Sequence, residues 1–342
     1  MTNGQSREDG TLGDDEYRWL IRRAKENFGV IITCAAHVSE DGQGWPGELG
    51  IWDDKHISGL KRLADGLHEF GTLALVQIFH GGARSPEHLT GTQPWSASSH
   101  IYTVGSKNIE VREATEHDIL QVTNDFIKAA IRAKEAGMDG VELHGAHGYL
   151  IHQFLSTATN TRTDQYGGNA ENRSRFLVDI LTGIRKEVGD NFIVGVRISP
   201  EDKYTFKGID FDESVDLAVR LAALGADYIH VSPWNALKKP DKYPNSDKTL
   251  IAWFREALQA DIPVMVAGEI WSVGDADQAM NLGADFIALG RAAIGIADWP
   301  VRARDPEFVP VYPPYTREYL RTCDLSETFI DYMKRWQGFV EN

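Results

Sequence analysis

The stretch "DGVELHGAHGYLIHQFL", residues 139–155, contains two structural patterns in succession. Residues 139–144 form a short apolar run that ends in His144. Such a run is typical of a strand in a buried parallel sheet. A turn rich in Gly and Ala follows, and it leads into a helical pattern. The stretch therefore predicts one βα unit.

The same alternation recurs along the whole chain. Apolar runs that resemble buried strands lie at 30–34, 73–79, 139–144, 193–198, 227–232, 262–267 and 285–290. Amphipathic helical patterns lie between them, for example at 53–70, 115–136 and 171–188. This order predicts an α/β fold, a TIM (β/α)8 barrel. No linker interrupts it, so we expect one domain over residues 1–342.

The number of strands raises a question about the start of the chain. A closed barrel has eight strands, and the sequence has seven candidates. A helical pattern at 13–27 precedes the first candidate, and a strand ought to precede that helix. The residues before it are polar, so we expect strand one to lie before Met1 or to be absent. An open barrel would expose two strand edges.

The final segment, residues 305–342, is rich in aromatic residues. We expect it to pack on the barrel. It either covers a partner subunit in a homo-oligomer or closes over the barrel itself, and the sequence leaves both possibilities open.

Charge and composition exclude several classes of protein. The formal net charge is -15 and no Lys/Arg-rich run occurs, which argues against binding to nucleic acid or an anionic membrane. No apolar run approaches the roughly 18 residues of a membrane span, and the polar N-terminus is unlike a signal peptide. Cys34 and Cys323 form no CxxC spacing, which argues against a disulfide framework, an iron–sulfur cluster or structural zinc. We expect a soluble, cytoplasmic protein.

Polar and glycine residues stand where the predicted strands end, and the chemistry of a barrel lies at those ends. Gln77 and Arg197 lie on two strands, and His144 ends a third. Gly268 and the pair Gly290-Arg291 follow the last two strands. Bare backbone N–H groups at these positions commonly bind phosphate, although glycine-rich turns also occur without it.

Three histidines and a tyrosine, His144, His147, Tyr149 and His152, lie close together in the opening stretch. His144 and His147 have metal-ligand spacing, but no nearby carboxylate or thiolate completes a set and HExxH is absent. We expect His152 to be a core residue that faces away. The other two are either core or capping residues, or they form with Tyr149 a group of donors suited to an oxyanion.

Two longer motifs, "VELHGAHGYLIHQFLS" (141–156) and "NTRTDQYGGNAENRSRF" (160–176), resemble the signature of the Old Yellow Enzyme family of FMN-dependent ene-reductases. "VQIFHGGAR", "VGVRISP", "VAGEIWS" and "ADFIALGRAAIGIADWP" match family segments in the same order. The resemblance thus covers essentially the whole chain. In the family, the "RTDQYGG" run is a structural loop, and we assign no chemistry to it.

The resemblance implies an FMN-bound barrel that reduces activated alkenes with NAD(P)H. The flavin would accept a hydride from NAD(P)H and deliver it from N5 to the β-carbon of an enone or similar acceptor. His144 and His147 would donate hydrogen bonds to the carbonyl oxygen of the acceptor. Tyr149 would protonate its α-carbon as a general acid.

The resemblance also implies contacts along the flavin. They are Thr2 and Ala35 near N5 and O4, Gln77 and Arg197 at the pyrimidine edge, and Gly268, Gly290 and Arg291 at the phosphate. In the family, strand one ends in an Ala-Pro-Met-Thr-like segment, of which Met1-Thr2 would be the tail, as if the chain were truncated. One branch of the family has cysteine where Thr2 stands. The pair His144/His147 is the His-His version of a pair that is His-Asn in other members.

Two other functions stay open at this point. A truncated barrel would bind flavin with impaired turnover, and the histidines would serve a metal-dependent barrel hydrolase if a metal were bound. Gln77 and Arg197 would also be compatible with a barrel interior in which they satisfy one another. The sequence does not decide between NADH and NADPH, and it does not identify the physiological acceptor.

Overall fold

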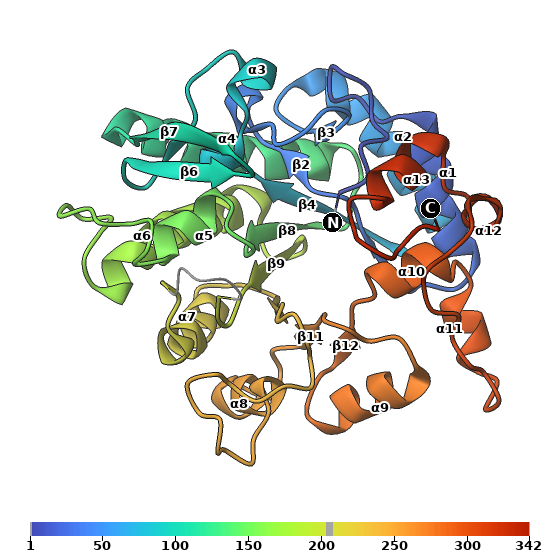
Figure 1. Ribbon diagram of the computed structural model, residues 1–342. Coiled ribbons are helices and arrows are strands. Elements are labelled where there is room, and N and C mark those ends of the chain that lie inside the picture. The colour runs from blue at the N-terminus through green and yellow to red at the C-terminus, as the bar shows by residue number, and fades with distance from the viewer. Residues whose placement is uncertain (1, 203–207, 342) are drawn as a thin grey trace.

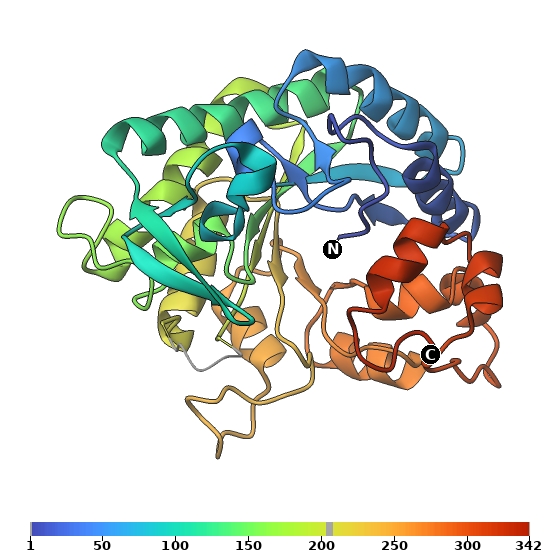
Figure 2. The same ribbon diagram turned by 45° about the horizontal axis from the view of Figure 1, so that its top comes forward.

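The structure, a computed structural model, describes residues 2–202 and 208–341. Parallel strands lie at the centre and helices surround them (Figures 1 and 2). In spatial order the sheet contains β12 (Phe286–Ile287), β11 (Val264–Val266), β10 (Tyr228–Val231), β9 (Ile193–Ile198), β8 (Gly140–Gly145), β4 (Leu73–Phe79), β2 (Ala36–His37) and β3 (Leu49–Gly50). β1 (Val30–Ile32) pairs with the first half of β4, and β2 pairs with its end.

Helices connect the strands and cover the outside of the sheet. The longer ones are α1 (Asp14–Lys25), α2 (Ile57–His68), α4 (Glu116–Glu135), α6 (Ala170–Val188), α7 (Phe211–Ala223), α8 (Leu250–Ala257) and α9 (Val273–Asn281). Their predicted apolar faces are buried, as Leu60, Leu63 and Leu67 of α2 illustrate. The alternation of parallel strands and helices confirms the predicted (β/α) barrel arrangement.

Some predicted boundaries were wrong. The run at 30–34 is not one strand, because the Thr33 hydroxyl accepts the hydrogen bond of the Gln77 amide and interrupts the ladder between β1 and β2. The last strand, predicted at 285–290, is reduced to two residues in β12. Within residues 2–202 and 208–341, no strand lies between β12 and β1, and the Phe286 side chain is 46% exposed.

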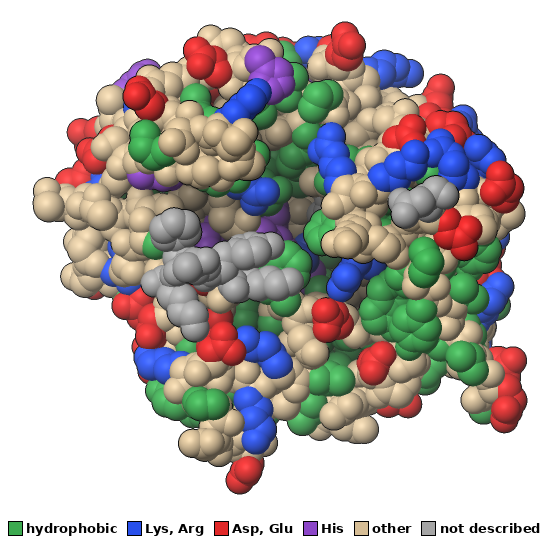
Figure 3. Space-filling view, in the orientation of Figure 1, with side chains coloured by type: hydrophobic (Ala, Val, Ile, Leu, Met, Phe, Trp, Pro, Cys, Tyr) green, Lys and Arg blue, Asp and Glu red, His purple; other side chains and the backbone are tan. Residues whose placement is uncertain are grey.

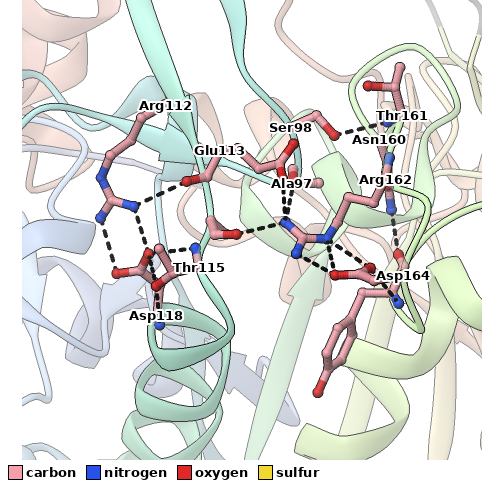
Figure 4. A network of polar contacts seen from close by, with 12 residues as sticks. Ala97, Ser98, Arg112, Glu113, Thr115, Asp118, Asn160, Thr161, Arg162 and Asp164 are labelled. Atoms are coloured by element: carbon pink, nitrogen blue, oxygen red, sulfur yellow. Dashed lines mark hydrogen bonds and ion pairs between the residues drawn. The ribbon is translucent and has the colours of Figure 1, made fainter.

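A segment between β4 and α4 forms several short elements that the sequence patterns did not predict. It contains η3 (Gly82–Arg84), α3 (Glu87–Thr90), β5 (Trp95–Ser96) and the hairpin β6 (His100–Val104) and β7 (Lys107–Glu113). Arg162 holds its base, because Nη1 donates to the carbonyls of Ala97 at 2.9 Å and Ala114 at 2.7 Å while Asp164 pairs with the same guanidinium (Figure 4). Arg162 and Asp164 of the "RTDQYGG" run therefore have structural partners.

Three aspartates fasten the N-terminal ends of neighbouring strands, each in the motif Gly-x-Asp. The backbone N–H of Asp139, Asp227 and Asp285 donates to the carbonyl of one residue on the neighbouring segment. The carboxylate Oδ2 of each aspartate accepts the backbone N–H of that same residue, at distances of 2.7–2.8 Å. Arg185 and Arg255 add ion pairs to the last two. These aspartates pin the register of the parallel sheet.

The aromatic tail contains α12 (Arg317–Thr322) and α13 (Glu327–Met333), which lie beside α1 (Figure 1). The Phe329 and Trp19 rings meet edge to face with centroids 5.2 Å apart, and Arg23 donates to the Cys323 carbonyl at 2.8 Å. The tail thus contacts its own chain, while the single-domain division stays a prediction. Among the described residues, no helix combines the length and apolar character that crossing a membrane requires.

Candidate active site

His144, His147 and Tyr149 come together where β8 ends and α5 (Leu150–Leu155) begins. The ring centroids of His144 and His147 are 5.2 Å apart, and those of His144 and Tyr149 are 5.1 Å apart. The turn between them is left-handed, with φ of 61° at His147 and 78° at Gly148. A non-glycine residue in this region is strained, which often marks a functional turn.

Burial fixes the protonation states of these three groups. It holds the pKa of both imidazoles well below the ordinary histidine value. It raises the pKa of Tyr149, and the nearby charge of Arg84 acts in the opposite direction. At neutral pH the site therefore presents two neutral imidazoles and one protonated phenol, all able to donate hydrogen bonds.

A serine that the sequence reasoning missed connects two of the predicted site residues. Ser232 Oγ lies 2.9 Å from Nε2 of His147 and accepts a hydrogen bond from Nη2 of Arg197 at 2.9 Å. Nδ1 of His144 and Nε of Arg197 are buried without a partner in the described part of the chain. The protein itself thus leaves one hydrogen-bonding atom of each of these two side chains unsatisfied.

Glu142 organises the polar interior of the barrel beside Arg197. Its carboxylate accepts from Gln77 Nε2 at 2.6 Å and Tyr228 Oη at 2.9 Å, and it lies 2.8 Å from Nδ1 of His230. Burial alone would raise the pKa of Glu142, but His230, Arg197 and these donors hold it below its usual range. The Glu142 anion thus balances the buried Arg197 cation, and Gln77 bonds Glu142 instead of Arg197 through this amide nitrogen.

Backbone and arginine groups follow β11 and β12, as predicted. Gly268 has φ of 142°, and a Cβ there would lie 2.5 Å from the Pro233 carbonyl oxygen, so only glycine fits. Gly290 precedes α10 (Arg291–Gly295). The Arg291 guanidinium lies 3.8 Å from Glu269 and is 39% exposed, so it is accessible from solvent.

Of the two predicted residues of the first segments, Thr2 contacts the tail. Ala35 is buried between β1 and β2. The Thr2 hydroxyl bonds the Tyr332 hydroxyl of α13. Burial raises the pKa of Tyr332 to about 12, and Tyr149 is among the groups that act on it. Thr2 and Tyr332 are thus paired across the fold, which no local pattern could reveal.

Two further missed residues surround Tyr149. The Arg84 guanidinium lies 4.4 Å from the centroid of its ring, and the Trp45 ring lies 6.4 Å away. Arg84 is the last residue of the motif "VQIFHGGAR", and this motif was the sequence signal that could have identified Arg84 as a site residue. In the space-filling view the face is hollowed near its centre, and histidine side chains are visible there (Figure 3).

His152 lies apart from this group, since its Nε2 is 3.0 Å from the Asp202 carboxylate. It has the bonded, mostly buried environment expected of a core histidine. Over the described ranges, no group of three His, Cys, Asp or Glu side chains is placed to hold a metal ion.

Comparison with known proteins adds a family to this geometry. The family model described as NADH:flavin oxidoreductase / NADH oxidase matches residues 1–306. The chain is 36% identical over 309 residues to a probable NADH-dependent flavin oxidoreductase, YqiG, of Bacillus subtilis, covering 89% of this chain and 82% of that protein.

Two further relatives agree with it. An NADPH dehydrogenase of Listeria welshimeri is 36% identical over 287 residues, which cover 83% of this chain and 81% of that protein. The solved structure of an Old Yellow Enzyme homologue from Zymomonas mobilis superposes with a TM-score of 0.81 at 27% identity, covering 94% of this chain and 90% of that one.

Proposed function

The chain belongs to the NADH:flavin oxidoreductase / NADH oxidase family, and we propose that it reduces the activated carbon–carbon double bond of an α,β-unsaturated carbonyl compound. It is an FMN-dependent oxidoreductase that uses NAD(P)H. The observation that carries the choice of acceptor is the grouping of two neutral imidazoles and a protonated phenol at the end of β8.

The residues present fit FMN. Arg197 keeps a buried Nε without a partner in the described chain, and Gly290 and the half-exposed Arg291 follow β12 at the start of α10. Bound FMN supplies hydride transfer between NAD(P)H and the acceptor. We propose that Thr2, Ala35, Gln77, Arg197, Gly268, Gly290 and Arg291 hold it.

Gln77 would play a defined part in this binding. Its Nε2 donates to Glu142 at 2.6 Å, so Glu142 fixes the orientation of the amide that we propose for flavin binding.

The three site residues divide the work on the acceptor. His144 and His147 donate hydrogen bonds to the acceptor's carbonyl oxygen and stabilise the negative charge that develops there. For His147, this bond replaces the contact with Ser232. Tyr149 donates its proton to the α-carbon, and the phenolate is then reprotonated from water.

The proposal is tested on the purified holoenzyme in two anaerobic steps. NADH or NADPH should bleach the flavin absorbance, and 2-cyclohexenone added afterwards should restore it with formation of cyclohexanone. Bleaching without recovery would refute the enone acceptor while leaving the NAD(P)H oxidoreductase activity in place.

A double variant, His144→Ala with His147→Ala, tests the oxyanion site. Binding of a phenol should weaken, since its phenolate resembles the enolate, while FMN content stays the same. The flavin spectrum reports both quantities in one titration. Unchanged phenol affinity would exclude the two histidines from acceptor binding, and loss of folding would assign them to the core.

We also propose that the enzyme acts in the cytoplasm, where NAD(P)H is regenerated, and forms a homo-oligomer. Cell fractionation tests the first statement. Light scattering on the eluting holoenzyme tests the second, and a mass near the 38.1 kDa of one chain would contradict it.

A further inference from the structure

We propose that Arg84 is a positioning residue for Tyr149: it holds the turn that carries the phenol and places a cation on the face of its ring. This inference rests on the proton-donor role proposed above. Arg84 Nη1 donates to the His147 carbonyl at 2.8 Å, and the guanidinium carbon lies 4.4 Å from the Tyr149 ring centroid. One side chain therefore contacts both parts of the site.

The loop that carries Arg84 is fastened to α5. The side chain of Gln153 accepts from the Ala83 amide at 3.1 Å and donates to the Gly148 carbonyl at 2.9 Å. Leu150 N donates to the carbonyl of His80 at 3.0 Å. Gly82 has φ of 60°, and a Cβ there would lie 2.4 Å from Gln153 Oε1. These contacts hold Arg84 in place before any ligand binds.

The turn that Arg84 holds needs such support. His147 is in the left-handed region, which a side chain disfavours, and it keeps this conformation only if its neighbours bind it. Ser199 Oγ accepts the His147 N–H at 3.1 Å, and Arg84 bonds the carbonyl. Together these two bonds satisfy both backbone groups of the strained residue.

The cation also acts on the proton transfer itself. When Tyr149 protonates the α-carbon, its O–H bond breaks, a C–H bond forms, and the electron pair stays on the phenolate. Negative charge then spreads into the ring, and a cation over the ring face stabilises it. Other described groups act on Tyr149 from several elements, namely Glu48, Tyr102, Arg197, His144 and Tyr332, and Arg84 lowers its pKa more than Arg197 does.

The first test uses Arg84→Met in the holoenzyme. Re-oxidation of the flavin by 2-cyclohexenone should slow by about 3- to 30-fold, which is the range of a cation–π contact, while reduction by NADH is unchanged. Arg62→Met is a matched control, because Arg62 lies 3.9 Å from the ring centroid of Tyr17 on the outer surface. In a Tyr149→Phe background, Arg84→Met should cause a smaller loss, because only the support of the His147 turn is then removed. Equal losses in both backgrounds would overturn the inference.

A second test needs no turnover. A ring-fluorinated tyrosine at position 149 makes the phenol more acidic, so that its titration can be followed by absorbance in the folded protein. Its pKa should rise in Arg84→Met and return toward the parent value in Arg84→Lys. An unchanged pKa would overturn the inference. If the parent enzyme fails to reduce the enone, the proposed acceptor is wrong, and this titration still decides the role of Arg84.

Discussion

The polar groups at the two ends of the parallel strands differ in whether they are hydrogen-bonded within the protein. At the N-terminal ends, Asp139, Asp227 and Asp285 complete their bonds with neighbouring segments. At the C-terminal ends, Nδ1 of His144 and Nε of Arg197 are buried without partners among the described residues. Satisfied polar groups stabilise a fold, whereas unpaired buried ones cost stability unless a ligand binds them. The comparison separates the end that holds the barrel from the end that does its chemistry.

The largest expected effect is at the C-terminal end, in Tyr149→Phe. Removing the hydroxyl preserves packing, so the melting temperature should hardly change. Flavin re-oxidation by an enone should slow by roughly 10²–10⁴-fold, as expected for loss of a general acid. Stopped-flow absorbance separates this step from reduction by NADH, which should continue at the parent rate. Equal slowing of both steps would remove Tyr149 from the proton transfer.

The converse change is Asp227→Ala at the N-terminal end. It leaves the Val194 N–H without its carboxylate partner and removes the pair with Arg185. The free energy of unfolding should fall by about 1–3 kcal/mol, while enone reduction per bound flavin is unchanged. Denaturant titration measures the first quantity. Asp216→Ala, at an exposed position of α7, is the control and should alter neither.

A pair of glycine substitutions compares the two ends directly. Gly268→Ala and Gly137→Ala both place a side chain at positive φ, 142° and 78°. The strain should cost about 1–2 kcal/mol at Gly137 and more at Gly268, where the Cβ would lie 2.5 Å from the Pro233 carbonyl oxygen. Only Gly268 lies against a neighbouring backbone, so only its variant should also lose FMN on dilution. Flavin fluorescence after gel filtration reports the loss. Equal retention in both variants would place the phosphate elsewhere.

The smallest expected effect concerns acid. Burial lowers the pKa of His37 to about 3 and that of His56 to about 4, below the ordinary value of 6.5. Below pH 6.5 the two imidazoles bind protons in the unfolded chain but not in the folded chain. The free energy of unfolding therefore falls as the pH is lowered. From pH 6.5 to 5.5 the loss should be about 1 kcal/mol per histidine.

His56→Gln tests this pH dependence, since it should flatten the decline by the share of one histidine. Denaturant titrations at the two pH values measure it. His68→Gln, which replaces a half-exposed histidine near the N-terminal strand ends, serves as the comparison. An identical slope in His56→Gln and the parent protein would show that His56 is not the acid-sensitive group.

Local patterns predicted much of the fold because burial in a parallel sheet demands apolar runs. β4 and β9 agree with the predicted runs at 73–79 and 193–198. One further signal in the sequence went unused: Gly-x-Asp occurs at 137–139, 225–227 and 283–285, each time before a strand. The hairpin β6–β7 gave no such signal, because Ile101 and Val104 point to solvent and no buried face imposes a pattern.

The sequence by itself determined the strand–helix order, the family and the grouping of His144, His147 and Tyr149, because each depends on residues close together in the chain or on motifs in a fixed order. Only the tertiary structure decided which distant residues complete the site. Arg84 reaches Tyr149 across 65 positions, Ser232 reaches His147 across 85, and Tyr332 meets Thr2 across 330. Closing such long loops depends on packing of the entire chain, and no local periodicity records which side chains then meet.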